Sequence, residues 1–414
     1  MPDDRFTGTV LGVVEGCTNP ESAEMLDDGE TFVFGNCRLD VGFPWFRESQ
    51  GLVYLQGEAF ITRARISPEG EVSVTERTLI GGLTTTLGCD ILRTDTEVFP
   101  SGTAFTVADG KPVARPDGSG PADVAPQVIG FDPMTGEIRG RIPLWKGSAI
   151  GERFEPLEMP NGLAIDSAGN FYVADCPHTN PATDPAAPPP VSPAVYRIPA
   201  AALGPLVREE PGAAESVSRV VMPGYVNGCA VSPVDGACWA VSCSPVDPVG
   251  GGVYRLPMSA FESGAQPPPR WRDIGEMDGV CVSRRGTVFV TAPLKNEIHA
   301  FTADGAHGIV TAAGLPTRMP ADLNVVYPRC LDGEPALMVA DIMVGTPPGT
   351  ARSRWWPCPV CDPDTPAGQG TPRARPGRPQ LSIRPCTFRA MKPSSRSSAV
   401  VTRPSASPRI WSVS

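Results

Sequence analysis

Short apolar runs joined by turn residues recur along the chain, and residues 159–175 show the pattern most clearly. Two apolar runs, 163–165 and 171–173, flank the turn-forming sequence Ser-Ala-Gly-Asn. This arrangement predicts a tight β-hairpin. Segments 226–241 and 277–291 repeat it with different residues. In the three copies the residue that opens the first strand and precedes glycine is Asn161, Asn227 or Asp278.

The repeat predicts an all-β fold, a six-bladed β-propeller. Its period of roughly 50–70 residues lies at the long end for a four-stranded blade. The expected blades begin near residues 19, 88, 161, 227, 278 and 321. Strand-like sequence ends near residue 344, so the sixth blade is the one expected to be incomplete. The valine-rich run 9–14 is expected to pair with that blade and close the ring.

Composition divides the chain into an expected propeller domain, residues 1–349, and a tail, residues 350–414. The tail carries about eleven Lys and Arg against two acidic residues and is rich in Pro and Ser, which predicts disorder. Cys358 and Cys361 have the spacing of half a zinc site, but only Cys386 follows them. So abrupt a change would also result from a reading-frame shift.

Charge and hydropathy exclude several classes of function. The net charge of −10 argues against a nucleic-acid-binding surface, and no apolar stretch is long enough to span a membrane. The first residues lack the features of a signal peptide, so we expect a cytoplasmic location. The twelve cysteines are scattered and are expected to be small buried thiols, although Cys17 and Cys37 could pair across the first hairpin.

The residues that open the inner strands are the main candidates for chemistry. A propeller brings these positions to one end of its central channel, and carboxylate and amide oxygens are the ligands that Ca²⁺ prefers. A single Asn-Gly would indicate only a turn. Asp90 and Asp322 match the repeat less well, and we expect them beside the site or in turns. The candidate ring is Glu21, Asp90, Asn161, Asn227, Asp278 and Asp322.

Other catalytic motifs are scarce. His178 follows the hairpin at 159–175 on a loop, where a histidine is either solvated or placed to carry a proton. The sequence contains no Gly-x-Ser-x-Gly elbow, phosphate loop or dinucleotide fingerprint. A serine hydrolase or a nucleotide-dependent enzyme is therefore not expected.

The motif at residues 160–175 resembles the calcium-dependent six-bladed propellers of the gluconolactonase and regucalcin group, with paraoxonase and diisopropyl fluorophosphatase as more distant relatives. Segment 278–291 is similar to the family's Asp-Gly hairpin. Segment 20–23 resembles its first Glu motif, although the usual Glu-Gly-Pro is altered and Glu15 is a rival. The resemblance covers roughly residues 9–345. It implies calcium, or another divalent cation, held by Glu21, Asn161, Asn227 and Asp278.

From this resemblance we expect a hydrolase that acts on a small-molecule lactone or related ester, with no nucleic-acid or membrane partner. The metal would polarise the carbonyl group, and Asp278, or with less support Glu21, would take a proton from water. Loops 38–51 and 177–193 would shape the substrate pocket. Two alternatives stay open because propellers serve many functions: phosphotriester hydrolysis at the same site, and binding of a ligand or protein without turnover.

Overall fold

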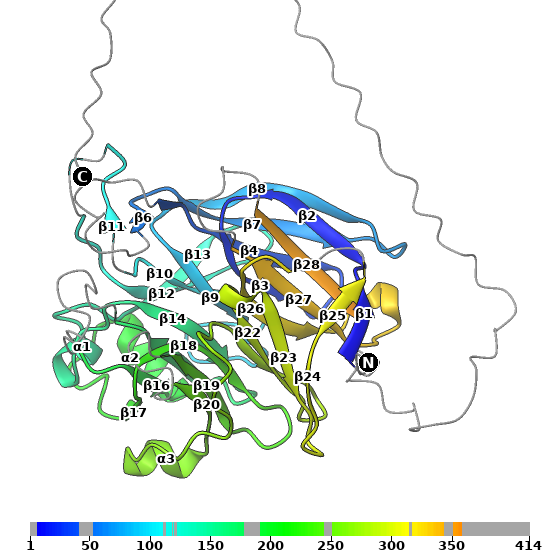
Figure 1. Ribbon diagram of the computed structural model, residues 1–414. Coiled ribbons are helices and arrows are strands. Elements are labelled where there is room, and N and C mark those ends of the chain that lie inside the picture. The colour runs from blue at the N-terminus through cyan, green and yellow to red at the C-terminus, as the bar shows by residue number, and fades with distance from the viewer. Residues whose placement is uncertain are drawn as a thin grey trace, which may run out of the picture. The chain divides into compact units, whose positions relative to one another are not determined.

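The computed structural model describes residues 6–40, 53–110, 113–117, 119, 122–177, 191–243, 251–313, 317–342 and 351–357 (Figure 1). The chain divides into two compact units, Met1–Asp364 and Thr365–Ser414, and all described residues belong to the first. None of the described helices is long and apolar enough to cross a membrane.

The described part of the first unit is a β-propeller. Each sheet is named here by its innermost strand. Five of the blades have four strands, given from the inner strand outward: β3 (Pro20–Met25), β4 (Thr31–Asn36), β7 (Ala59–Ile66) and β8 (Val72–Leu83); β9 (Thr86–Ile91), β10 (Ala104–Ala108), β12 (Gln127–Phe131) and β13 (Ile138–Pro143); β14 (Pro160–Ile165), β15 (Phe171–Asp175), β16 (Ala194–Ile198) and β17 (Ser218–Val221); β21 (Val280–Val282), β22 (Val288–Ala292), β23 (Glu297–Phe301) and β24 (His307–Ile309); β26 (Pro320–Val326), β27 (Ala336–Asp341), β28 (Ala351–Pro357) and β2 (Gly12–Cys17).

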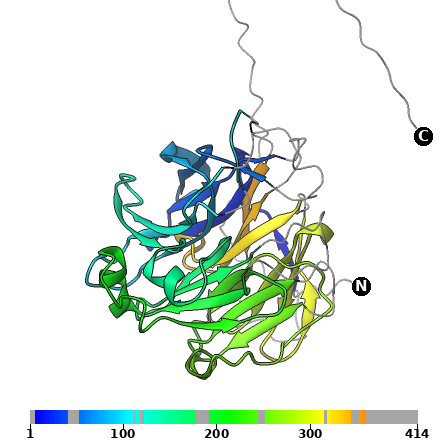
Figure 2. The same ribbon diagram turned by 90° about the vertical axis from the view of Figure 1, so that its left-hand side faces the viewer.

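A further sheet has three strands: β18 (Tyr225–Val231), β19 (Cys238–Cys243) and β20 (Gly252–Leu256). The inner strands are neighbours in the order β3, β9, β14, β18, β21, β26 and back to β3. In Figure 2 the green β18 sheet lies between its two neighbours, the β14 blade and the β21 blade. The inner strands therefore surround one central channel.

Smaller elements connect or cover the sheets. Two short sheets join β1 (Thr7–Thr9) to β25 (Thr311–Ala313), and β5 (Leu39–Asp40) to β6 (Val53–Leu55) and β11 (Val113–Ala114). The helices are α1 (Ala149–Arg153), α2 (Ala200–Val207), α3 (Met258–Ser263), η3 (Pro293–Lys295) and η4 (Arg329–Leu331).

The expectation of six four-stranded blades is corrected, because five blades are complete and the β18 sheet has three strands among the described residues. Beyond β20, pairing is limited to one isolated bridge between Val253 and Trp271. Three consecutive prolines, residues 267–269, precede this bridge. Proline has no amide proton to donate to a strand ladder, so the sequence there cannot continue as a regular outer strand.

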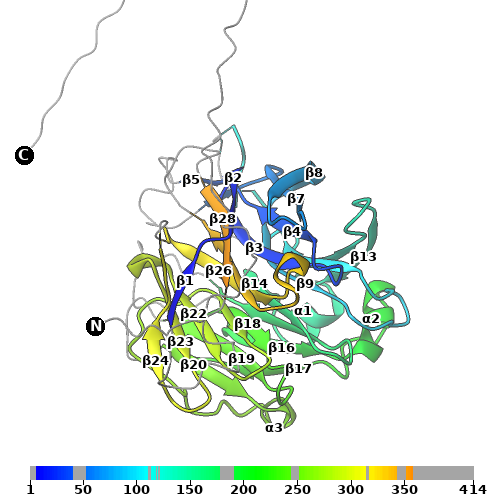
Figure 3. The same ribbon diagram turned by 90° about the vertical axis from the view of Figure 1, so that its right-hand side faces the viewer.

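The last blade, expected to be the incomplete one, has all four strands. Strand β28 pairs with β27 on one side and with β2 on the other, and Figure 3 shows the blue β2 beside the orange β28. The predicted closure by an N-terminal strand is thus confirmed, although β2 spans Gly12–Cys17 rather than residues 9–14. Strand β28 lies in the expected tail, so the statement that this tail lacks strands is wrong for Ala351–Pro357.

The predicted hairpin at residues 159–175 is confirmed. Leu163 pairs with Val173, and Ile165 pairs with Phe171. Gly169 in the connecting turn has φ +79, a conformation that glycine adopts without steric cost. Apolar side chains from neighbouring sheets fill the spaces between the blades; for example, Phe105 of β10 contacts Phe171 of β15 edge to face.

The described cysteines are thiols, as expected for most of them. Cys17 and Cys37 are both buried thiols, so the alternative of a disulfide between them is wrong. The sulfur of Cys37 contacts the carbonyl oxygen of Thr86 at 3.6 Å. Burial raises the pKa of this thiol to about 12, which makes it unreactive at neutral pH.

Candidate functional site

Four of the six inner strands share one irregularity near the point where they begin. The pairing register shifts between Pro160 and Leu163 in β14, and at the equivalent places in β3, β18 and β26. Such a bulge re-aims the side chains of the extra residues. The first residue within the four bulges is Glu21, Asn161, Asn227 or Ala321.

The glycine after each opening residue serves close packing rather than a turn. Gly162, Gly228 and Gly279 lie outside the left-handed region of φ. A Cβ atom on Gly162 would lie 2.6 Å from the Cys229 nitrogen, and one on Gly228 would lie 2.5 Å from the Asp278 carbonyl oxygen. Neighbouring inner strands therefore approach too closely for any larger residue. The interpretation of Asn-Gly as a turn is wrong here.

Three of the four predicted metal ligands interact through their side chains. Glu21 is 4% exposed and is hydrogen-bonded to the side chain of Asn161. Burial raises the pKa of Glu21 well above its ordinary value, and the negative charges of Asp278 and Asp322 raise it further. Burial likewise raises the pKa of Asp278 to about 8, with contributions from Asp322 and Glu276. The protein alone therefore stabilises the ionised forms of Glu21 and Asp278 poorly.

Asn227, the fourth predicted ligand, opens the strand between those of Asn161 and Asp278. Its Oδ1 atom is buried and has no hydrogen-bond partner in the described structure. The same holds for Oε2 of Glu21. Buried polar atoms are normally paired, so two unpaired oxygens at equivalent positions around one channel require an explanation.

Asp322 and Asp90 occupy other positions in the channel. Asp322 lies one residue beyond the opening position; its carboxylate accepts a hydrogen bond from Ser22 Oγ at 2.7 Å, and burial raises its pKa to about 6. Asp90 accepts from the Ile165 amide at 2.6 Å and pairs with Arg93. Asp322 thus lies beside the site, as expected, whereas Asp90 belongs to the far end of the inner strands.

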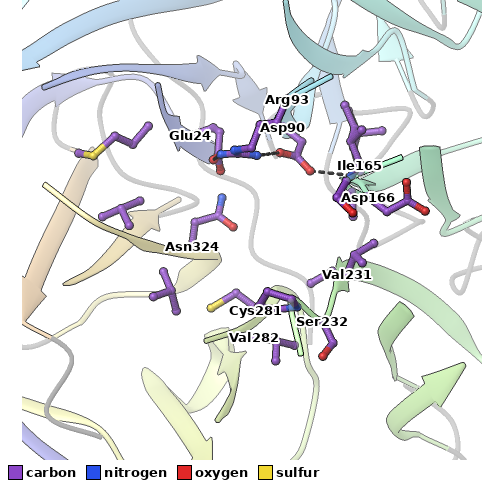
Figure 4. A pocket seen from close by; sticks show the side chains of 18 of the residues that line it. Glu24, Asp90, Arg93, Ile165, Asp166, Val231, Ser232, Cys281, Val282 and Asn324 are labelled. Atoms are coloured by element: carbon purple, nitrogen blue, oxygen red, sulfur yellow. Dashed lines mark hydrogen bonds and ion pairs between the residues drawn. The ribbon is translucent and has the colours of Figure 1, made fainter. Parts of the chain in front are cut away.

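That far end contains a cavity of about 630 Å³ (Figure 4). Arg93 lies in its wall between two carboxylates, 2.8 Å from Glu24 and 3.1 Å from Asp90. Burial raises the pKa of Glu24 to about 8 despite the neighbouring Arg93. None of the four predicted ligands lines this cavity, although Asp322 does. Sequence analysis missed this cavity, because its lining residues come from several strands that are far apart in the sequence.

The set of four oxygen-bearing side chains fits a hard cation. Among the described residues, His, Cys, Asp and Glu alone form no group of three or more that could hold a metal. Two of the four candidate ligands, Glu21 and Asp278, are carboxylates. The other two, Asn161 and Asn227, would contribute amide oxygens. Calcium accepts amide as well as carboxylate oxygens, whereas zinc prefers nitrogen and sulfur.

Tyr54 is a residue near the site that sequence analysis missed. It is 2% exposed and lies on β6. Burial raises the pKa of its phenol, and the charges of Glu21 and Asp278 raise it further, which places the phenol within electrostatic range of both carboxylates. No repeated motif marks this position. His178 and most of loops 38–51 and 177–193 lie outside the described residues.

No protein-family model and no curated protein sequence matches this chain. The solved structures to which it is similar include a gluconolactonase from Xanthomonas campestris, with 15% identity over 84% of this chain and 97% of that chain, and a TM-score of 0.41. A calcium-binding regucalcin from Agrobacterium tumefaciens gives 12% identity over 84% of this chain and 93% of that one, with a TM-score of 0.42.

An aldose sugar dehydrogenase from Streptomyces coelicolor, in its PQQ-bound form, is also similar, with 13% identity over 86% of this chain and 99% of that chain, and a TM-score of 0.49. The family that the sequence motifs resemble is thus among the structural matches, together with an oxidoreductase. The strand pairing described above defines the protein as a β-propeller.

Proposed function

We propose that this protein is a calcium-dependent hydrolase of lactones or related esters, with calcium held by Glu21, Asn161, Asn227 and Asp278. The observation that carries the proposal is the pair of buried, unpaired oxygens, Oε2 of Glu21 and Oδ1 of Asn227. Each costs about 1–3 kcal/mol when left without a partner. A bound cation would satisfy both. The names of the gluconolactonase and regucalcin matches agree with the substrate class and the metal.

The chemistry follows from the positions of the side chains. Bound calcium would polarise the carbonyl group of the substrate and stabilise the negative charge that develops on its oxygen. Asp278 would take the proton from the attacking water, a task for which a carboxylate with a raised pKa is suited. The neighbouring charges of Asp322 and Glu276 favour that protonation. Asn161 is hydrogen-bonded to Glu21; with its amide nitrogen as the donor, its oxygen would be available as a calcium ligand.

The proposal is tested with the purified full-length chain and a panel of lactones, carboxylic esters and phosphotriesters. We expect lactone hydrolysis that a chelator abolishes and added calcium restores. Turnover of phosphotriesters in preference to lactones would assign the same site to the alternative reaction. Calcium binding without turnover of any substrate would indicate a binding propeller.

A pair of matched variants locates the activity. Asn227→Leu removes one of the unpaired oxygens and should abolish calcium-dependent turnover. Asn324→Leu removes an amide from another inner strand, at the cavity of the far end, and should retain it. Loss of turnover in Asn324→Leu but not in Asn227→Leu would indicate that the active site lies in that cavity instead.

A further inference from the structure

Four of the six second strands carry, at equivalent positions within their last two residues, a polar side chain that holds the backbone just before the inner strand. In the β3 blade Asn36 accepts from the Thr18 amide at 3.0 Å. In the β21 blade the equivalent position is Ala292, and the residue before it, Thr291, accepts from the Gly279 amide at 2.7 Å. In the β18 sheet the Ser242 hydroxyl donates to the Pro223 carbonyl. The same device is therefore built from different side chains.

In the β14 blade this position is Asp175, which is completely buried. Its Oδ1 atom accepts from the Met159 amide at 2.9 Å, and its Oδ2 atom is 3.4 Å from the Glu158 nitrogen. The Cys176 amide donates in turn to the Met159 carbonyl at 2.9 Å. The backbone at Met159 is thus fixed from both sides, two residues before Asn161 and immediately before the bulge that aims its side chain.

The β26 blade contains the same device without a predicted ligand. Asp341, also completely buried, accepts from the Arg318 amide at 3.2 Å, and the Ile342 amide donates to the Met319 carbonyl at 3.0 Å. Pro320 pairs with Asp341 just as Pro160 pairs with Asp175. The position equivalent to Asn161 is Ala321, which has no side-chain oxygen.

We infer that Asp175 is a positioning residue for Asn161: it holds the backbone that sets the Asn161 amide oxygen toward the cation. The inference rests on the proposed calcium site. Partners that orient metal ligands typically change metal affinity 10- to 100-fold when they are removed. Asp341 supports its blade in the same way but orients no ligand, so its loss should affect stability alone.

The test compares Asp175→Ser with Asp341→Ser. Serine occupies the equivalent place in the β18 sheet as Ser242, so the fold tolerates it there. Its shorter side chain carries one oxygen and does not reproduce the carboxylate's two contacts. Calcium affinity is measured by calorimetry on metal-free protein, and the melting temperature is measured without calcium. We expect about a 10-fold weaker calcium affinity for Asp175→Ser and less than a twofold change for Asp341→Ser.

A conservative variant provides the rescue. Asp175→Asn retains an oxygen that can accept from the Met159 amide, and it should bind calcium within about threefold of the wild-type affinity, well short of the loss expected on removal. Equal affinities for Asp175→Ser and the wild type would overturn the inference while leaving the calcium site intact. An equal loss of calcium affinity in the two serine variants would also overturn the inference, because Asp175 would then support the fold only as Asp341 does. Absence of calcium binding to the wild type would overturn the proposed site, and the inference with it.

Discussion

Glu21→Gln should stabilise the metal-free protein while weakening its affinity for calcium. The Glu21 side chain is buried, and its pKa is raised well above 4.5 by burial and by the charges of Asp278 and Asp322. Folding without metal therefore favours the protonated form of this carboxyl group. Glutamine has the same shape, needs no proton, and can donate its amide to a neighbouring carboxylate.

The magnitude follows from the ordinary pKa of glutamate. Keeping a carboxyl group protonated costs about 1.4 kcal/mol for each pH unit above 4.5, so at pH 7 the cost is at most about 3.5 kcal/mol. The folded-state pKa is raised, so the contribution of Glu21 to stability is intact below pH 4.5 and is lost as the pH rises. The advantage of glutamine should therefore grow from near zero at pH 4.5 to its full value at pH 7.

Chemical unfolding at several pH values, with a chelator and then with calcium, measures both effects. Calcium at 100 times its Kd adds about 2.7 kcal/mol to the stability of the wild type. Glu21→Gln should gain less, so calcium should narrow or reverse the difference between the two proteins. A metal-free Glu21→Gln protein that is less stable than the wild type at pH 7, or an advantage that does not change with pH, would refute this account of Glu21.

Three further predictions concern packing, catalysis and ring closure. Gly162→Ala should destabilise the fold by about 1–3 kcal/mol in denaturant unfolding, because its Cβ would meet the backbone of the next strand; Gly110→Ala, whose nearest atoms are 3.6 Å away, is the control and should cost little. Asp278→Asn should lower kcat more than calcium affinity, since the amide keeps an oxygen but cannot act as a base; equal losses in kinetics and calorimetry would leave Asp278 only a ligand. Deleting every residue after Pro357 should leave the Tm nearly unchanged, whereas a deletion that also removes β28 should lower it clearly, and equal Tm values for the two truncations would contradict the pairing of β28 with β2.

The hairpins and the candidate ligands could be predicted because each repeats. Apolar runs of three residues are ambiguous individually, but the same order of an oxygen-bearing residue, glycine, strand, turn and strand at Asn161, Asn227 and Asp278 left few other readings. The purpose of the glycine could not be predicted, because close approach between strands of different blades is a property of the assembled ring. The dipeptide Asn-Gly indicates a local backbone conformation, but it does not show which strand of the next blade will pack against the glycine.

The remaining features carry no repeated signal. Strand β28 lies in a basic, proline-rich context, and its pairing depends on two partners far away in sequence. The three-stranded β18 sheet was predictable in principle from the prolines at 267–269. The cavity with Arg93 between Glu24 and Asp90 forms where different inner strands end, so no single segment of the sequence predicts it. Tyr54 lies near the site on β6, a strand outside the blades.

The closure of the ring by β2 has a consequence for how the protein is made. Gly12 pairs with Trp355, so β2 leaves the ribosome about 340 residues before its partner strand is synthesised. At 5–20 residues per second this delay is roughly 20 to 70 s. Throughout it, β2 has an unpaired edge that strands of other nascent chains can join. The last blade can therefore be completed only after β28 has been synthesised.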